Sequence, residues 1–146
     1  MGFVVDFDAT NNILRVTMDD HITDSVALRC AETVGRYAAS RREYRGIVDL
    51  SNVTKYDVSP EIIRQFARTP PNVSADAYTL VIVAPGKHPF GMSRMFQLLS
   101  ETTRPNQHVV RTMEEAFELL QVMSPAFVPV DLSSMSQEKT GTRKPE

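Results

Sequence analysis

The stretch from residue 78 to residue 84 constrains the fold more than any other part of the chain. It reads Tyr-Thr-Leu-Val-Ile-Val-Ala and is apolar almost throughout. A run of this length and composition is typical of a central strand whose two faces are both covered. It is far too short to cross a bilayer. We therefore expect a sheet built around this strand, with helices packed against it.

Apolar periodicity on both sides of this stretch predicts alternating strands and helices. The predicted strands are 3–8, 13–19, 45–50, 78–84 and 108–111, and a helix follows each of the last four. The first two strands are joined by Thr10-Asn11-Asn12, which favours an antiparallel hairpin because Asn tolerates left-handed turns. The order ββαβαβαβα predicts an α/β fold with a mixed sheet of about five strands and four helices. The residues expected to be buried in this sheet are Ile47, Val81, Ile82 and Val83.

The second predicted helix begins with recognisable capping residues. Ser59 precedes Pro60 and Glu61, so a capping hydroxyl, a proline and an acid stand in the order that helix starts favour. We expect the side-chain oxygen of Ser59 to accept a hydrogen bond from the backbone N–H of Glu61 or Ile62.

The third predicted helix begins near Pro89 and is apolar on more than one face. Its expected core stripe consists of Met92, Met95, Phe96 and Leu99. Phe90 and Leu98 widen the apolar surface beyond one core contact, which predicts a homodimer formed through this helix. In the alternative, Phe90 folds back over the preceding loop and Leu98 packs under the apolar segment 126–130.

A chain of 146 residues has the size of one domain. We expect a folded domain over residues 1–123 and a polar, flexible tail over residues 124–146, because the tail is too polar to bury a core. Residues 126–130, Ala-Phe-Val-Pro-Val, form an apolar exception that is suited to docking on the domain or on a partner.

Charge and cysteine content narrow the classes of partner and compartment. The formal net charge is −2, which argues against a nucleic-acid partner. The first residues lack the basic start and long apolar run of a signal peptide. Cys30 is the only cysteine, so no internal disulfide is possible. These features together predict a cytoplasmic protein without a membrane span.

Residues with catalytic or metal-binding chemistry are scattered. The three histidines, His21, His88 and His108, lie far apart in the sequence. Asp19-Asp20-His21 offers metal-ligand chemistry but no third and fourth group, which favours a solvated turn. Cys30 lies on the apolar stripe of the first helix, where a thiol behaves as a small hydrophobe. The sequence therefore predicts a non-enzymatic protein with no cofactor and no metal site.

Two segments carry a family resemblance. Residues 48–59 contain a Val-Asp-Leu-Ser strand, then Val-Thr, then an Asp-x-Ser motif that opens a helix. Residues 83–85 read Val-Ala-Pro, and residues 90–99 read Phe-Gly-Met-Ser-Arg-Met-Phe-Gln-Leu-Leu. With these motifs the chain resembles the STAS family of anti-sigma-factor antagonists, in its SpoIIAA-like (STAS/SEC14-like) branch. The resemblance covers about residues 3–122 and implies the SpoIIAA-like fold.

The resemblance implies a regulatory role for Ser59. In STAS regulators a serine at this position is phosphorylated by a partner kinase, which changes the affinity for a protein partner. A phosphate at a helix N-terminus is favoured by free N–H groups and the helix dipole, and it adds charge to a docking surface. Pro60 stands where the family has glycine, which stiffens the turn. In the alternative, Ser59 only caps the helix, and Asp57 is an Asx-turn residue.

The segment 85–94 forms a second candidate surface. A loop at the C-terminal end of a central strand is a general place for ligands in open α/β sheets. Arg94 is suited to pair with a carboxylate or an acidic headgroup beside an apolar wall. In the alternative, the apolar residues belong to the core or a dimer interface, and Arg94 is a solvated salt-bridge partner. The candidate binding residues of the two surfaces are Asp57, Lys87, His88, Phe90, Met92 and Arg94.

Two functions follow as hypotheses. The leading one is a regulatory protein-interaction module, with a regulator or kinase as partner, that is switched at Ser59. The alternative is a carrier or sensor of a small amphipathic or lipid-like ligand bound near residues 85–94 and the third helix. An internal apolar cavity of several hundred Å³ would favour the carrier, since an interaction module needs no cavity.

Overall fold

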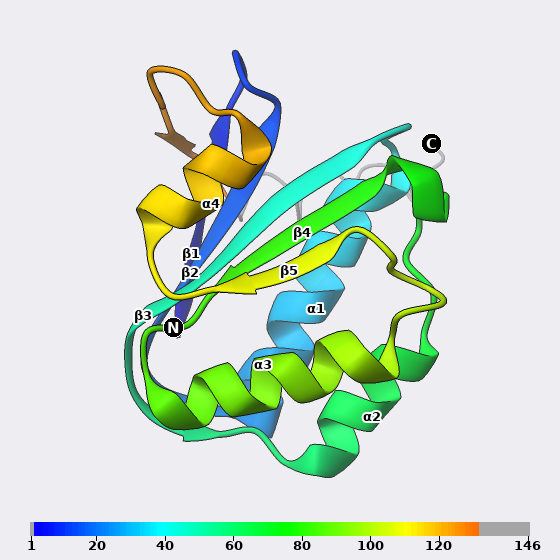
Figure 1. The fold of residues 1–146 in the computed structure, drawn as a ribbon, viewed down its shortest axis with the longest axis vertical. Helices are drawn as coiled ribbons and strands as arrows, with labels where there is room; N and C mark the ends of the chain where they lie inside the picture. The colour runs from blue at the N-terminus through cyan, green and yellow to red at the C-terminus, as the bar shows by residue number, and fades with distance from the viewer. Residues whose placement is uncertain (1, 132–146) are drawn as a thin grey trace, which may run out of the picture.

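A computed structural model describes residues 2–131, so the predicted tail from residue 132 onward lies outside the described residues. The chain alternates strands and helices, which confirms the predicted α/β class (Figure 1). In chain order the elements are β1 (Phe3–Asp8), β2 (Ile13–Thr23), α1 (Asp24–Ala39), β3 (Tyr44–Asp57), α2 (Pro60–Arg68), a short 3-10 helix (Ala75–Ala77), β4 (Tyr78–Val83), α3 (Lys87–Leu99), β5 (Gln107–Val110), α4 (Met113–Leu120) and β6 (Val128–Pro129).

The sheet has six strands in the order β5-β4-β3-β2-β1-β6. Strands β2, β3, β4 and β5 are parallel, whereas β1 is antiparallel to both of its neighbours, so the predicted mixed sheet and hairpin are confirmed. In the hairpin turn Asn12 has a φ of 57°, the left-handed conformation expected of this segment. Strand β6 makes the sheet one strand wider than predicted. This strand has two residues, one of which is Pro129. Because proline lacks an N–H and is rare in strands, the sequence pattern does not predict β6.

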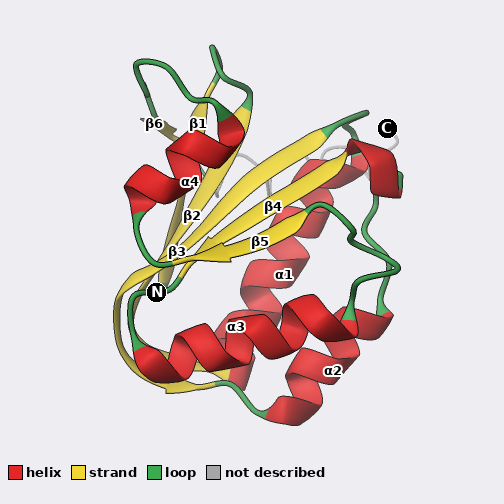
Figure 2. Ribbon diagram, viewed as in Figure 1, coloured by secondary structure: helices red, strands yellow, loops and turns green. Residues whose placement is uncertain are grey.

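Helices cover both faces of the sheet (Figure 2). On one face α1, α2 and α3 pack over a core that includes Leu80 and Ile82. On the other face α4 packs over Ile47, Val81 and Val83. Successive β4 residues therefore alternate between the two cores, as the period of a strand requires. The four residues predicted to be buried in the sheet are all buried.

Strands β2 and β3 continue well beyond the rest of the sheet. Pairing of β3 with β4 ends at Asp49, but pairing of β3 with β2 continues to Asp57. Both strands are longer than predicted, because the residues of the extension are mostly polar and do not follow the alternating apolar pattern of a strand. Asp19-Asp20-His21, expected in a solvated turn, lies within β2 at a register shift where Asp20 has a φ of 58°. The resulting two-stranded extension, residues 19–23 with residues 52–57, leads directly into α1 and α2.

Helix α3 begins earlier than predicted. Most of the expected loop 85–94 is helical, with Gly86 at the N-cap. Pro89 lies in the first turn, where its missing N–H leaves no hydrogen bond unmade. The buried face of α3 includes Ser93 and Ser100, which are two turns apart. Leu99, predicted to be in the core, is 50% exposed because this serine-containing face points to the sheet instead.

Of the two apolar residues of α3 beyond its predicted core stripe, Phe90 is packed within the described chain and Leu98 is exposed. Phe90 packs against the core, with the Arg111 guanidinium 3.8 Å from its ring centroid. Leu98 is 57% exposed and does not pack under residues 126–130, because that segment docks beside β1. The predicted homodimer stays a prediction.

A buried carboxylate, Asp8, holds the C-terminal segment on the domain. It is 0% exposed. Its Oδ1 accepts from the backbone N–H of Asn11 at 3.1 Å, and its Oδ2 accepts from Asn11 Nδ2 at 2.7 Å and from the Ala126 N–H at 3.1 Å. The next residue, Phe127, lies beneath the Arg15 guanidinium at 3.9 Å. The apolar segment 126–130 therefore docks on its own domain, along β1.

We predict that Asp8→Asn destabilises the fold by about 1–3 kcal/mol at neutral pH, because an amide NH₂ would face buried donors. Burial alone would raise the pKa of Asp8, but hydrogen bonds from Asn11 and Ala126 outweigh it and lower the pKa. A carboxyl group whose pKa is lower in the folded state stabilises the fold at pH values above its unfolded-state pKa. This stabilisation is lost as the pH falls through the folded-state pKa. The difference in unfolding free energy between the wild type and Asp8→Asn, measured by urea denaturation, should therefore decrease below roughly pH 4.

The matched control is Asp76→Asn, since Asp76 is exposed. That change should alter the unfolding free energy by less than about 0.5 kcal/mol. An Asp8→Asn loss that is constant between neutral and acid pH would contradict the assigned role of the carboxylate.

Candidate functional site

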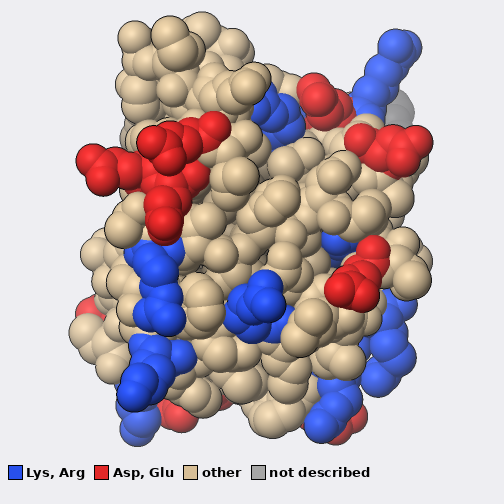
Figure 3. Space-filling model, in the orientation of Figure 1, with Lys and Arg blue, Asp and Glu red and all other residues tan. Residues whose placement is uncertain are grey.

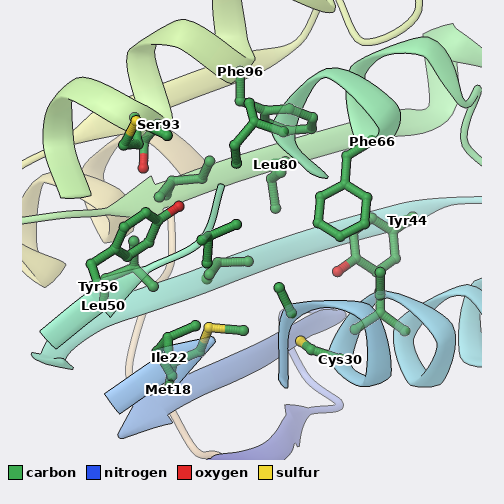
Figure 4. Close-up of a pocket in the computed structure, with 18 of the residues that line it drawn as sticks. Met18, Ile22, Cys30, Tyr44, Leu50, Tyr56, Phe66, Leu80, Ser93 and Phe96 are labelled. Carbon is green, nitrogen blue, oxygen red and sulfur yellow. The ribbon is translucent and has the colours of Figure 1, made fainter. Parts of the chain in front are cut away.

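An apolar cavity of about 180 Å³ lies between the sheet and the three helices α1, α2 and α3. Its floor is formed by β2, β3 and β4, and the extension of β2 and β3 closes one end with Ile22 and Tyr56 (Figure 4). Helix α1 contributes Cys30, and α3 contributes Met92, Ser93 and Phe96.

Four residues of this largely apolar lining carry a hydroxyl group, and that of Tyr78 interacts with Arg104. The other three hydroxyls belong to Tyr44, Tyr56 and Ser93, and their oxygens point into the cavity from different sides (Figure 4). Tyr44 is 2% exposed and Ser93 is 4% exposed. Among residues 2–131 none of the three hydroxyls has a hydrogen-bond partner. Tyr56 is half-buried. The three hydroxyls are therefore free to hydrogen-bond to a molecule in the cavity.

Tyr44 reaches the cavity because residue 46 is glycine. The tyrosine ring lies along β3, and a Cβ at Gly46 would overlap its hydroxyl group. The ring also stacks on Tyr78, with 5.2 Å between the ring centroids. This close approach fixes where the hydroxyl can point.

The cavity carries no charge at neutral pH. Burial raises the pKa of the Cys30 thiol to about 12. Burial, reinforced by the Asp24 carboxylate, raises the pKa of Tyr56 to about 12. Burial also raises the pKa of Tyr44 well above its ordinary value. The lining residues include no Asp, Glu, Lys, Arg or His, so every polar group facing the cavity is neutral.

A surface groove of about 390 Å³ lies next to the cavity, along α1 and α2. The cavity and the groove share five lining residues, which are Ala31, Val34, Phe66, Tyr78 and Phe96. The cavity and the groove therefore adjoin at these side chains.

Ser59 occupies the N-cap of α2, as predicted. Its Oγ accepts from the Ile62 N–H at 3.3 Å, and its own N–H donates to Asp24 Oδ1 at 2.7 Å. The side chain is half-buried. The second bond joins the start of α2 to the start of α1.

Asp57 ends β3 and pairs across the extension with His21. His21 Nε2 lies 2.7 Å from Asp57 Oδ2, and Lys55 Nζ lies 3.8 Å from the same oxygen. The hydrogen bond with His21 lowers the pKa of Asp57. The pair is exposed, which leaves it available to a partner.

The two candidate surfaces meet at Tyr56. The ring of His88, in the first turn of α3, lies edge-on to the ring of Tyr56 at 5.5 Å between centroids. Tyr56 thus faces the cavity with its hydroxyl and contacts the α3 surface with its ring. The start of α3 and the end of β3 therefore form one continuous surface beside the cavity.

Of the remaining predicted binding residues, one lines the cavity and the others lie elsewhere. Met92 lines the cavity. Lys87 is exposed, and the structure does not bring it to the cavity. Phe90 packs under Arg111. Arg94 Nη1 donates to Gln97 Oε1 at 2.5 Å, so it bonds an amide rather than the carboxylate expected of a salt bridge.

Sequence reasoning missed Tyr44, Cys30 and Ser93 as cavity residues. The apolar pattern of the first helix predicts a core position for Cys30, and Ser93 lies within the apolar pattern of the third helix. The one available signal was the serine spacing of Ser93 and Ser100, two polar residues at a helical interval among methionines and phenylalanines.

Charges are separated on the face shown in Figure 3. Acidic side chains gather over α4, and basic side chains lie directly below them, toward the start of α3. Neither sign of charge dominates this face.

Comparisons with known proteins add no assignment. A search against models of known protein families and a search of curated proteins both find no match. Within residues 2–131 no helix is long and apolar enough to cross a membrane. The same part of the chain contains no group of three or more His, Cys, Asp or Glu side chains placed to hold a metal ion together.

We predict that Ser59→Ala lowers the free energy of unfolding by about 1 kcal/mol, because the capping bond to Ile62 is lost. Ser59→Asp should keep most of the stability, since Asp is also a good N-cap. Urea denaturation measures both variants. The control is Ser51→Ala, at an exposed site whose hydroxyl makes no bond among the described residues. Equal stability of Ser59→Ala and wild type would show that the cap contributes nothing.

Proposed function

We propose that the protein is a non-enzymatic sensor or carrier that binds a small, mainly apolar molecule in the cavity beneath α1, α2 and α3. The observation that carries this proposal is a largely apolar space faced by three hydroxyls, from Tyr44, Tyr56 and Ser93, that have no hydrogen-bond partner among residues 2–131. A ligand with a polar group supplies the missing hydrogen bonds, and its apolar part fills the space.

The cavity volume limits the ligand. About 180 Å³ is less than the several hundred Å³ expected for a carrier of lipid-like molecules. An engineered apolar cavity of about 150 Å³ in another protein binds benzene. The lipid-like part of the sequence hypothesis therefore gives way to a smaller molecule. The ligand site also lies deeper than the expected loop, beneath α3 rather than at its start.

The chemistry of the lining supports a non-enzymatic role. General bases and nucleophiles need groups that ionise near neutral pH or a base within reach. The groups that face the cavity are hydroxyls and a thiol whose pKa burial raises to about 12. Such groups bind and orient a ligand without transferring protons at neutral pH.

We also propose that the protein is a STAS-like module of the SpoIIAA-like branch. The support is the resemblance of residues 48–59 and 90–99, together with the observed alternation of strands and helices. The same support makes a regulatory switch at Ser59 the second candidate function. One observation favours it: Ser59 is only half-buried and lies two residues after the exposed Asp57 of the His21 pair.

The proposed ligand site predicts that benzene stabilises the wild type. Ligand at one hundred times its Kd adds about 2.7 kcal/mol, which raises the melting temperature by several degrees. Ala27→Leu should abolish this shift, because Ala27 lines the cavity and is buried, so the larger side chain fills the space. Differential scanning calorimetry with and without benzene measures the effect.

Ala39→Leu is the matched control, since Ala39 is exposed on the same helix and should keep the full shift. Cys30→Met fills the same cavity and replaces Ala27→Leu should that variant not fold. A shift of equal size in wild type and in the filled variants would refute the cavity as the binding site.

The switch predicts different partner binding by two Ser59 variants. Ser59→Asp adds a charge while keeping the cap, and Ser59→Ala removes the cap without adding charge. We expect a protein captured by the wild type from the native cell to be lost by Ser59→Asp and retained by Ser59→Ala. Mass spectrometry should also find phosphate on Ser59 of the native chain. Identical capture by both variants, with Ser59 unmodified, would eliminate the switch.

A further inference from the structure

The geometry points to the chemical class of the ligand: a neutral molecule with one aromatic ring and at least one hydrogen-bonding substituent, as in phenol. This inference rests on the proposed ligand site. It concerns the identity of the ligand and adds three constraints, which are size, aromatic character and neutrality.

Size sets the number of rings. The cavity, about 180 Å³, is slightly larger than the cavity of about 150 Å³ that holds benzene elsewhere. One six-membered ring therefore fits and leaves room for a small substituent. A fused ring system with substituents, or a long acyl chain, would exceed this volume.

The walls favour an aromatic ring over an aliphatic one. Tyr44, Tyr56, Phe66 and Phe96 surround the space, and aromatic pairs gain energy beyond the area that they bury. Met18 and Met92 add two thioethers, whose sulfur atoms make favourable contacts with ring edges. An aliphatic ring of the same size gains the apolar burial but neither of these contacts.

The polar groups select a neutral substituent. The three hydroxyls donate or accept a hydrogen bond, and they face the cavity from β3 and from α3 (Figure 4). No charged side chain lines the space, so a buried carboxylate or ammonium would have no partner of opposite charge. A hydroxyl, carbonyl or amide group on the ring satisfies the hydroxyls without that cost.

Four probes test the three constraints by isothermal titration calorimetry: phenol, benzene, cyclohexanol and benzoate. We expect phenol to bind roughly three- to tenfold more tightly than benzene, the factor that one hydrogen bond gives. Cyclohexanol should bind more weakly than phenol, by roughly twofold or more, because it lacks the ring contacts. Benzoate should show no binding at neutral pH.

Variants then locate the hydrogen bond. At least one of Tyr44→Phe, Tyr56→Phe and Ser93→Ala should lower the affinity for phenol roughly three- to tenfold while leaving benzene unchanged. The matched control is Tyr37→Phe, which deletes a hydroxyl that lies outside the cavity lining and has no partner among the described residues. It should change neither affinity, so a general effect of losing such a hydroxyl is excluded.

The outcomes separate this inference from the proposed function. Equal binding of phenol, benzene and cyclohexanol, indifferent to the three variants, overturns the ligand class but leaves a general apolar site. Binding of benzoate overturns neutrality. If none of the four probes binds, both the ligand class and the proposed function are wrong.

Discussion

The parallel pairing of β2 with β3 is the interaction on which the rest of the structure depends. Beyond Asp49, β3 has only β2 as a neighbour, yet the pair continues to Thr23 and Asp57. Because backbone groups pair with each other along this extension, it stays ordered outside the main sheet. Its inward residues close one end of the cavity, and its end delivers the chain to the caps of α1 and α2. The backbone pairing of β2 with β3 therefore positions both the cavity and the start of α2 at Ser59.

Tyr56 lies between the cavity and the exposed surface near Ser59. Its hydroxyl faces the cavity, its ring contacts His88 on α3, and the next residue forms the His21 pair. A molecule that bonds the Tyr56 hydroxyl acts on a side chain that also packs against the outer surface. The proposed ligand site and the proposed switch are therefore physically adjacent.

The sequence was sufficient for the architecture because its signals were local and strong. The apolar run of β4, the cap at Ser59 and the apolar periodicity of the helices each depend on a few neighbouring residues. Three features escaped prediction because they depend on contacts distant in sequence. Strand β3 continues through polar residues because β2 pairs with it there. Strand β6 forms beside β1 because Asp8 and Arg15 contact residues 126 and 127. Ser93 is buried because the packing of α3 on the sheet turns this side chain inward. The cavity is a property of assembled walls, so Met92 alone among the predicted binding residues lines it.

The central claim is that a small aromatic molecule occupies the cavity, and intermolecular nuclear Overhauser effects test it most directly. The methionine methyl groups are convenient reporters, since Met18 and Met92 line the cavity whereas Met113 packs on the opposite face of the sheet. With phenol present at saturation, the account predicts cross-peaks from the ring protons of phenol to the methyl groups of Met18 and Met92. Cross-peaks to Met113 instead, or to no methionine at all, would contradict it.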